Sequence, residues 1–229
     1  GKAWFKDRIG KLMDYERFGV PKSAGGRYFY MRNDGLQNQS VLYVRDGLNG
    51  TGRALIDPNG WAKDGATALD QWEPSDNGAL LAYSVQDGGS DWRTINVLDV
   101  ASGAVKGDMV RWSKFGNIAW IGNEGFLYSR FPEPAADQAF QALNLNHAVY
   151  YHKVGTDQAA DTLIYATPDR DTLNHVAEVT SDGRWIVVSS SSGTDEKYEV
   201  RARRVGDKGD WHVIAGAFEN DWKLVDGVG

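Results

Sequence analysis

The chain has 229 residues, a length that suits one large domain or two small ones with a buried core. It carries 25 Lys and Arg against 31 Asp and Glu, a net charge of −6 without a long basic run, which disfavours nucleic acid and anionic membranes as partners. Hydrophobic residues make up 41% of the chain, which excludes disorder, and the absence of Cys excludes disulfides and thiol chemistry.

The first predicted element is an amphipathic helix over residues 3–17. Its apolar side chains recur at a spacing near 3.6 residues, at Trp4, Phe5, Ile9, Leu12 and Met13. No stretch reaches the roughly 18 apolar residues that a membrane helix needs, and the N-terminus lacks the apolar run of a signal peptide. The sequence therefore predicts a soluble protein of the cytoplasm or the periplasm.

From Arg27 onward the pattern changes to short runs rich in Tyr, Val, Ile and Trp, separated by turn signals. One further helical signal covers residues 134–144. The chain is predicted to be all-β, with strands at 27–31, 41–45, 80–85, 94–100, 118–120, 126–129, 149–152, 162–166, 185–189, 198–205 and 211–215.

A turn that ends in Gly and leads into an apolar strand repeats along the chain. The glycines are Gly26, Gly78, Gly125, Gly183 and, in a partial copy, Gly227, at intervals of 52, 47, 58 and 44 residues. A period near 50 with three or four strands is typical of a β-propeller blade, which buries its apolar faces on its neighbours. We expect residues 1–22 to form a helix and linker, and residues 23–229 to form blades one to four of a ring truncated at the start of blade five.

The four histidines do not suggest a metal site. His147 and His152 are five residues apart in a predicted strand, which puts their side chains on opposite faces, and a structural role is favoured for both. Asp76, Asp182 and Asp226 open turns, where a carboxylate accepts backbone hydrogen bonds, and too few oxygen ligands surround them for calcium. We therefore predict no metal and no cofactor.

The chain also lacks the residues of a complete hydrolase. A Gly-x-Ser-x-Gly nucleophile elbow is absent, and the similar Gly88-Gly89-Ser90 is followed by Asp91 and Trp92 rather than by small residues. The serine run at 189–192 has no His or Lys near it in sequence, so a solvated loop or a channel lining is favoured. By its own residues this segment is not a complete enzyme.

Several strings, in this order and spacing, resemble the propeller domain of the prolyl oligopeptidase family, in particular prolyl endopeptidases of bacterial type. The resemblance runs from about residue 15 to the C-terminus. The strings include GRYFY (26–30), NDGLQNQ (33–39), GGSDWRTI (88–95), KF (114–115) before IAW (118–120), YSRFP (128–132) and VYYH (149–152).

The resemblance implies a seven-bladed propeller that caps an α/β-hydrolase domain with a Ser-Asp-His triad, in enzymes that cleave short peptides after proline. The triad and its serine motif are absent here, so we expect no catalytic residue in this chain and no activity from it alone. The implied partners are short proline-containing peptides and the α/β-hydrolase domain of the same parent chain.

Five positions match residues that, in the family, line the substrate pocket or contact the catalytic domain beside it. The resemblance implies that Phe115 lines the pocket for the substrate residue two before proline, although an ordinary core aromatic is the alternative. It implies that Asp91 pairs with an arginine of the catalytic domain, the alternative being a turn residue at a blade edge. Asn174, Ser191 and Thr194 match pocket positions where animal enzymes carry Met, Arg and Cys, so they are weaker candidates.

Two functions follow. The chain is either the substrate-gating, pocket-wall segment of a proline-specific serine endopeptidase or a non-catalytic propeller that binds a protein or a glycan. The two differ in whether the gene continues past Gly229 into three more blades and a Gly-x-Ser-x-Gly elbow.

Overall fold

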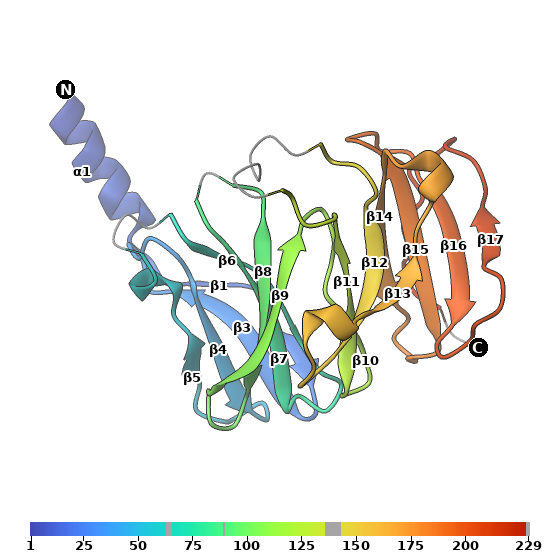
Figure 1. Ribbon diagram of the computed structural model, residues 1–229. Coiled ribbons are helices and arrows are strands. Elements are labelled where there is room, and N and C mark those ends of the chain that lie inside the picture. Colours follow the sequence, from blue (N-terminus) through green and yellow to red (C-terminus); the bar gives the residue numbers. More distant parts are fainter. Residues whose placement is uncertain (63–65, 89, 136–142, 228–229) are drawn as a thin grey trace.

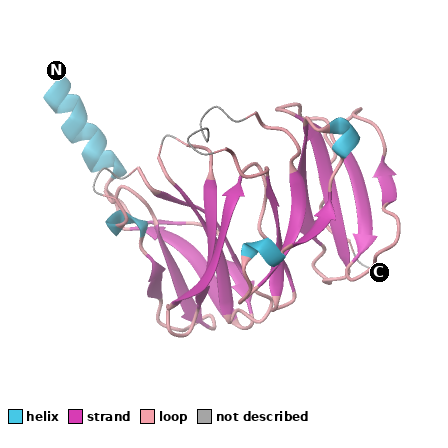
Figure 2. Cartoon of the chain, in the orientation of Figure 1, coloured by secondary structure: helices cyan, strands magenta, loops and turns pink. Residues whose placement is uncertain are grey.

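The fold is a curved row of antiparallel sheets preceded by one α-helix, seen along the chain in Figure 1 and by element type in Figure 2. The structure is a computed structural model that describes residues 1–62, 66–88, 90–135 and 143–227. Strands dominate these residues, as the sequence predicts. None of the helices within the described ranges has the length and apolar character needed to cross a membrane.

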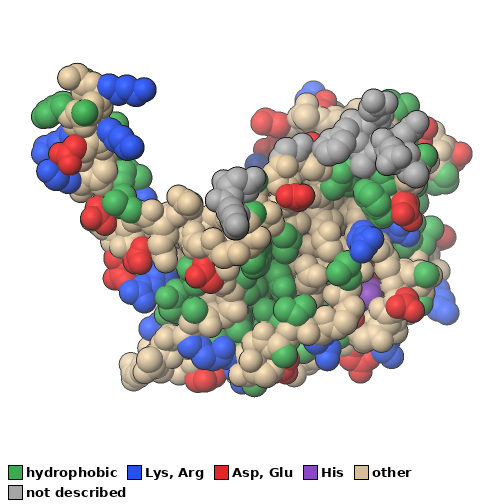
Figure 3. Space-filling view, turned by 60° about the vertical axis from the view of Figure 1, so that its left-hand side comes forward, with side chains coloured by type: hydrophobic (Ala, Val, Ile, Leu, Met, Phe, Trp, Pro, Cys, Tyr) green, Lys and Arg blue, Asp and Glu red, His purple; other side chains and the backbone are tan. Residues whose placement is uncertain are grey.

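Helix α1 (Lys2–Met13) projects away from the sheets and buries none of its residues (Figure 1). Its hydrophobic side chains lie on the surface beside charged ones in Figure 3, and Trp4 is 62% exposed. The predicted helix extended to residue 17, which is wrong at its C-terminal end. Arg17 instead pairs with Asn33 on the first sheet, where its guanidinium donates to Asn33 Oδ1 (3.1 Å) and to the Gly35 carbonyl (2.8 Å).

The strands form four successive antiparallel blades, of which the second and third are joined into one eight-stranded sheet by a single pairing of Ser113 with Arg130. Blade one contains β1 (Arg17–Phe18), β2 (Lys22–Ala24), β3 (Arg27–Asn33), β4 (Val41–Asp46) and β5 (Arg53–Ile56). Blade two contains β6 (Ala68–Pro74), β7 (Leu80–Gln86), β8 (Arg93–Asp99) and β9 (Val105–Ser113). Blade three contains β10 (Ala119–Ile121), β11 (Gly125–Arg130), β12 (Ala148–Lys153) and β13 (Thr162–Tyr165). Blade four contains β14 (Leu173–Val179), β15 (Trp185–Ser192), β16 (Glu199–Arg204) and β17 (His212–Ala215).

The hydrophobic core lies between the blades, as radial stacking requires. Phe29 and Leu42 of blade one pack with Leu81 of blade two in one buried cluster. The next two clusters repeat the arrangement between blades two and three and between blades three and four. Each blade covers the apolar face of its neighbour, which confirms the predicted propeller architecture.

The repeated turns tie neighbouring blades together at one edge. The Asn77 backbone N–H donates to Asn123 Oδ1 on the next blade (2.8 Å), and the Ser181 backbone N–H donates to Asp226 Oδ1 in the same way (3.0 Å). Gly78 has φ +64°, and a Cβ there would lie 2.5 Å from the Ala24 carbonyl oxygen. Glycine at position 78 is therefore required both for a left-handed turn and for close contact between blades, whereas Gly26 and Gly183 share only the left-handed turn.

Every predicted strand overlaps a strand of the structure, but β5, β6, β9 and β14 were missed, as were the short β1 and β2. Strands β6 and β14 carry polar residues such as Asp70 and Glu178, which line a cavity rather than a hydrophobic core. The predicted helix at 134–144 falls largely on residues 136–142, outside the described residues.

Candidate functional site

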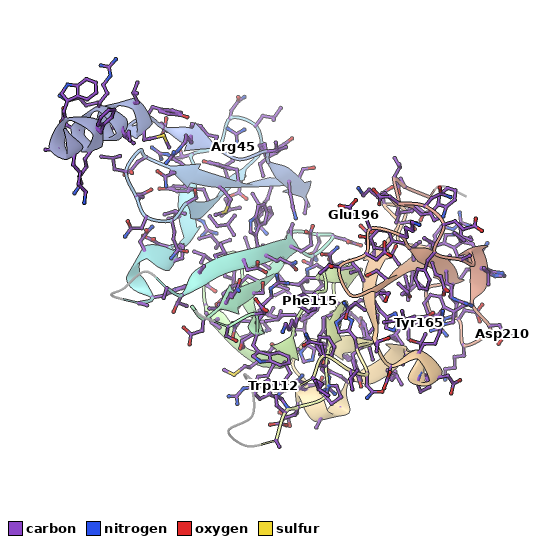
Figure 4. The ribbon with its side chains drawn as sticks, turned by 90° about the horizontal axis from the view of Figure 1, so that it is seen from above. Arg45, Trp112, Phe115, Tyr165, Glu196 and Asp210 are labelled. Atoms are coloured by element: carbon purple, nitrogen blue, oxygen red, sulfur yellow. The ribbon has the colours of Figure 1, made fainter. Side chains whose placement is uncertain are left out.

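Phe115 lies in the loop between β9 and β10, toward the inner side of the row of blades when the chain is viewed from above (Figure 4). Its side chain is 42% exposed and its backbone is left-handed, with φ +55°. A bulky residue adopts this conformation at a cost and keeps it only where the surroundings enforce it. An exposed aromatic in an enforced backbone is a candidate for ligand contact.

Three contacts fix the loop on either side of Phe115. His147 Nε2 donates to the Lys114 carbonyl (2.8 Å), and Gln71 Nε2 donates to the Gly116 carbonyl (3.0 Å). A Cβ at Gly116 would lie 2.6 Å from Ser129 Cβ, so only glycine allows the loop to lie this close to β11. The Phe115 ring is thus presented from a rigid support.

Below the Phe115 ring lies a buried aromatic base. The Phe131 ring, 2% exposed, meets Phe115 edge to face with 6.2 Å between centroids, and Trp92 packs on it at the same distance. Trp112 meets Trp92 at 5.5 Å, and the His147 ring lies 4.5 Å from Phe131. One side of the Phe115 ring therefore packs on Phe131, and the other side is exposed.

Lys114 brings two of the predicted site residues together. Its ammonium lies 3.4 Å from the Asp91 carboxylate, 5.1 Å from the Trp92 ring centroid and 4.8 Å from that of Phe115. It also donates to Asn144 Oδ1 at 3.2 Å. The lysine side chain is 11% exposed and that of Asp91 is 67% exposed, so the carboxylate can accept a second cation. We name this cluster the Phe115 group: Asp91, Trp92, Lys114, Phe115 and Phe131.

Sequence reasoning did not single out Lys114 as a site residue. The available signal was its position directly before Phe115, but a lysine in a loop usually faces water. Its burial depends on Trp92 and Asn144, which are distant in sequence.

The other three predicted residues lie together on blade four. Asn174 of β14 faces Ser191 of β15 in the strand register, and Thr194 lies in the exposed turn that follows β15. Asn174 Nδ2 donates to the Gly193 carbonyl at 3.4 Å, while its buried Oδ1 accepts no hydrogen bond from the described residues. We name these three residues the Asn174 group.

His147 links the two groups. Its Nε2 donates to the Lys114 carbonyl, and its Nδ1 accepts the backbone N–H of His175 (2.8 Å), the neighbour of Asn174. Burial lowers the pKa of His147 to about 4, and burial followed by the charges of His147 and Arg170 lowers the pKa of His175 to about 3. Both imidazoles are therefore neutral near pH 7. The sequence suggested that His147 lies in a strand. In the structure it lies one residue before β12.

His152 belongs to a different cluster, between blades two and three. Its Nδ1 donates to Asp161 (2.7 Å) and its Nε2 to Asp108 of β9 (3.2 Å), and all three side chains are buried. Burial alone would lower the pKa of His152, but the hydrogen bonds and charges of the two carboxylates raise it. Within the part of the chain that the structure describes, no group of three or more His, Asp or Glu side chains is arranged to hold a metal ion.

The innermost strands β2, β6, β10 and β14 line a cavity of about 600 Å³. Charged and polar side chains enter it, among them Lys22, Asp70, Glu73 and Glu178. Burial raises the pKa of Glu178. This cavity lies among all four blades, and its wall combines these polar groups with apolar side chains such as Trp72 and Trp120.

Comparisons with known proteins agree on the family. Residues 2–229 match the family described as "Prolyl oligopeptidase, N-terminal beta-propeller domain". The prolyl endopeptidase of Elizabethkingia meningoseptica is 35% identical over 227 residues, which cover 97% of this chain and 32% of that protein. Prolyl oligopeptidase ophP of Omphalotus olearius is 32% identical over 212 residues, which cover 83% of this chain and 28% of that protein.

Solved structures show the same architecture. One from a study of two prolyl endopeptidases has 47% identity and a TM-score of 0.88, and covers all of this chain and 32% of that one. Prolyl oligopeptidase B from Galerina marginata, bound to a 25mer macrocyclization substrate, has 25% identity and a TM-score of 0.83 over 99% of this chain and 36% of that one. The chain spans about a third of the length of the curated relatives it matches. It belongs to the prolyl oligopeptidase family, within the N-terminal β-propeller domain.

Proposed function

We propose that the chain is the substrate-gating, pocket-wall segment of a proline-specific serine endopeptidase that hydrolyses short peptides after proline. In this proposal the Ser-Asp-His triad lies on an α/β-hydrolase domain elsewhere in the parent protein, and the propeller supplies one wall of the site. The observation that carries the proposal is Phe115, exposed and held in a left-handed backbone on a buried aromatic base.

Phe115 is proposed to contact the side chain of the residue two before proline. Covering an apolar side chain with an aromatic ring stabilises a complex by about 1.5 to 3 kcal/mol. Asp91 is proposed to pair with an arginine of the hydrolase domain, and its 67% exposure leaves room for that contact. Asn174, Ser191 and Thr194 are proposed to form the more polar side of the pocket.

The proposed domain organisation has a helix and linker at residues 1–22 and blades one to four at 23–229, although Arg17, Phe18 and Lys22 of the linker pair with β3 of blade one. Two observations support further blades in the parent protein. Asp226 makes the contact to Ser181 that Asn123 makes to Asn77 two blade boundaries earlier. A cavity of about 570 Å³ also runs along an apolar face of blade four, lined by side chains that include Trp185, Val187, Ile214, Trp222 and Leu224.

The test compares the full-length gene product with the 229-residue chain on a chromogenic Gly-Pro substrate. The full-length protein should cleave it, a serine-directed inhibitor should block the cleavage, and the chain alone should be inactive because it lacks a nucleophile with its base. A full-length protein without this activity would contradict the proposal and favour a non-catalytic binding propeller. Inhibitor-sensitive cleavage by the chain alone would contradict it as well.

A further inference from the structure

We infer that Lys114 is a positioning residue for substrate binding, because its ammonium fixes the ring of Phe115. The inference rests on the proposed function of Phe115 and assigns a role to a residue that was not among the predicted site residues. The proposed role is to support Phe115 rather than to contact the peptide, because the Lys114 side chain is only 11% exposed.

The ammonium lies among four groups that match a cation. Two are aromatic rings, Trp92 at 5.1 Å and Phe115 at 4.8 Å, both within the range of a cation–π interaction. The other two are oxygens, Asp91 Oδ2 at 3.4 Å and Asn144 Oδ1 at 3.2 Å. A partly desolvated ammonium is stable only when paired in this way, so its position is well defined.

Aromatic contacts hold the Phe115 ring on one side. Its backbone is held through Lys114 and Gly116, and among the aromatic rings of the described residues its ring meets the edge of Phe131. With 42% of the residue exposed, the ring would gain freedom to rotate without the cation beside it. Ordering a mobile ring costs conformational entropy on binding, and this cost should appear as a higher KM.

The role of the charge can be separated from that of the methylene stem. Lys114→Met keeps an unbranched apolar side chain of similar length and removes the ammonium, whereas Lys114→Arg keeps a cation that can stack on aromatic rings. Arg45 of β4 offers a matched control, because its guanidinium lies over Tyr28 (5.6 Å) and Tyr30 (5.8 Å) on blade one. Figure 4 shows that Arg45 lies far from Phe115.

The experiment measures kcat, KM and melting temperature for these variants in the full-length enzyme. We expect Lys114→Met to raise KM about 3- to 10-fold with kcat within about 2-fold of wild type, consistent with one lost cation–π contact. Lys114→Arg should restore KM to within about 2-fold, and Arg45→Met should leave KM unchanged. If Lys114→Met does not fold, Lys114→Gln removes the charge while it keeps a donor for Asn144.

A second comparison tests whether Lys114 acts through Phe115. In a Phe115→Ala background, Lys114→Met should raise KM by less than about 2-fold, because the ring that it positions is gone. A full additional increase would mean that the lysine contacts the peptide itself, and would overturn the inference. A wild-type KM in the Lys114→Met variant would also overturn the inference. The proposed function would still stand if the Phe115→Ala variant had a raised KM. If neither variant changed KM, the proposed role of Phe115 would fail first.

Discussion

The Phe115 group and the Asn174 group differ in how their side chains are supported. Phe115 exposes apolar surface above a buried aromatic base and beside an ion pair, in a loop whose carbonyls are held on both sides. The Asn174 group is polar, and its one side-chain hydrogen bond has a donor–acceptor distance of 3.4 Å. Binding free energy concentrates where apolar surface is presented from a rigid support. We therefore expect the first group to determine affinity and the second to adjust it.

The largest expected effect is at His147, the residue that links the groups, and it appears as a dependence of stability on pH. The unfolded imidazole titrates near 6.5, whereas burial lowers the pKa in the folded protein to about 4. Between these values the unfolded chain binds more protons, so stability is lost as the pH falls from about 6.5 toward 4. The loss should reach roughly 3 kcal/mol for this group.

Denaturant unfolding of wild type and His147→Gln across this range checks the prediction. Glutamine keeps a donor and an acceptor but does not titrate, so the variant should lose about 3 kcal/mol less than wild type between pH 7 and pH 4. An identical pH dependence in the two proteins would show that His147 is not buried in its neutral form. The stability contribution of His152 should change with pH in the opposite direction. Because the pKa of His152 is raised in the folded protein, its contribution to the free energy of unfolding is lost as the pH rises above 6.5.

The next largest effect is expected from Phe115→Ala. Loss of the ring should lower kcat/KM about 10- to 100-fold for proline substrates with a large apolar residue two before proline, equivalent to about 1.5 to 3 kcal/mol. The melting temperature should change little, because the side chain is 42% exposed. Steady-state kinetics of the full-length enzyme measure this, with Arg45→Met as the control away from the site. A loss of activity that follows a loss of folded protein would point to a core role instead.

Asp91→Ala should have a smaller effect. Removal of the carboxylate leaves the proposed hydrolase-domain arginine unpaired, and we expect kcat/KM to fall at least about 10-fold with little change in melting temperature. Asp91→Asn should be milder because it keeps one acceptor oxygen. Wild-type kcat/KM in Asp91→Ala would identify Asp91 as a turn residue whose interaction with Lys114 is only local.

The smallest effects are expected in the Asn174 group. Alanine at Asn174, Ser191 or Thr194 should change kcat/KM less than about 3-fold, because each removes a small polar side chain that is at least partly exposed. Ser191 and Thr194 variants should leave the melting temperature unchanged. A change above 10-fold from any one of them would remove the contrast between the groups.

The sequence predicts well the strands that are rich in aromatic and apolar residues, such as β3 and β12. It failed for β6 and β14, because polar residues such as Asp70 and Glu178, which line the cavity, interrupt the apolar run. The position of Phe115 followed from family resemblance, but its left-handed backbone could not be predicted. That conformation depends on Gln71 and His147, which reach the loop from distant parts of the chain.

Of the residues around Phe115, the supporting ones were the hardest to predict. Lys114 and His147 act through contacts 23 to 33 residues away along the chain, with Asp91, Asn144 and each other. Their residue types alone favour a solvated lysine and a structural histidine. Local pattern therefore says little about which side chains hold Phe115 in place.

The central claim is that Phe115 contacts the substrate residue two before proline. The most direct measurement is kcat/KM of the full-length enzyme and its Phe115→Ala variant on two peptides that differ only at that residue, one with Phe and one with Gly. Wild type should prefer the Phe peptide at least about 10-fold, and Phe115→Ala should reduce the preference to within about 2-fold with little change for the Gly peptide. An equal preference in the two enzymes would contradict the account.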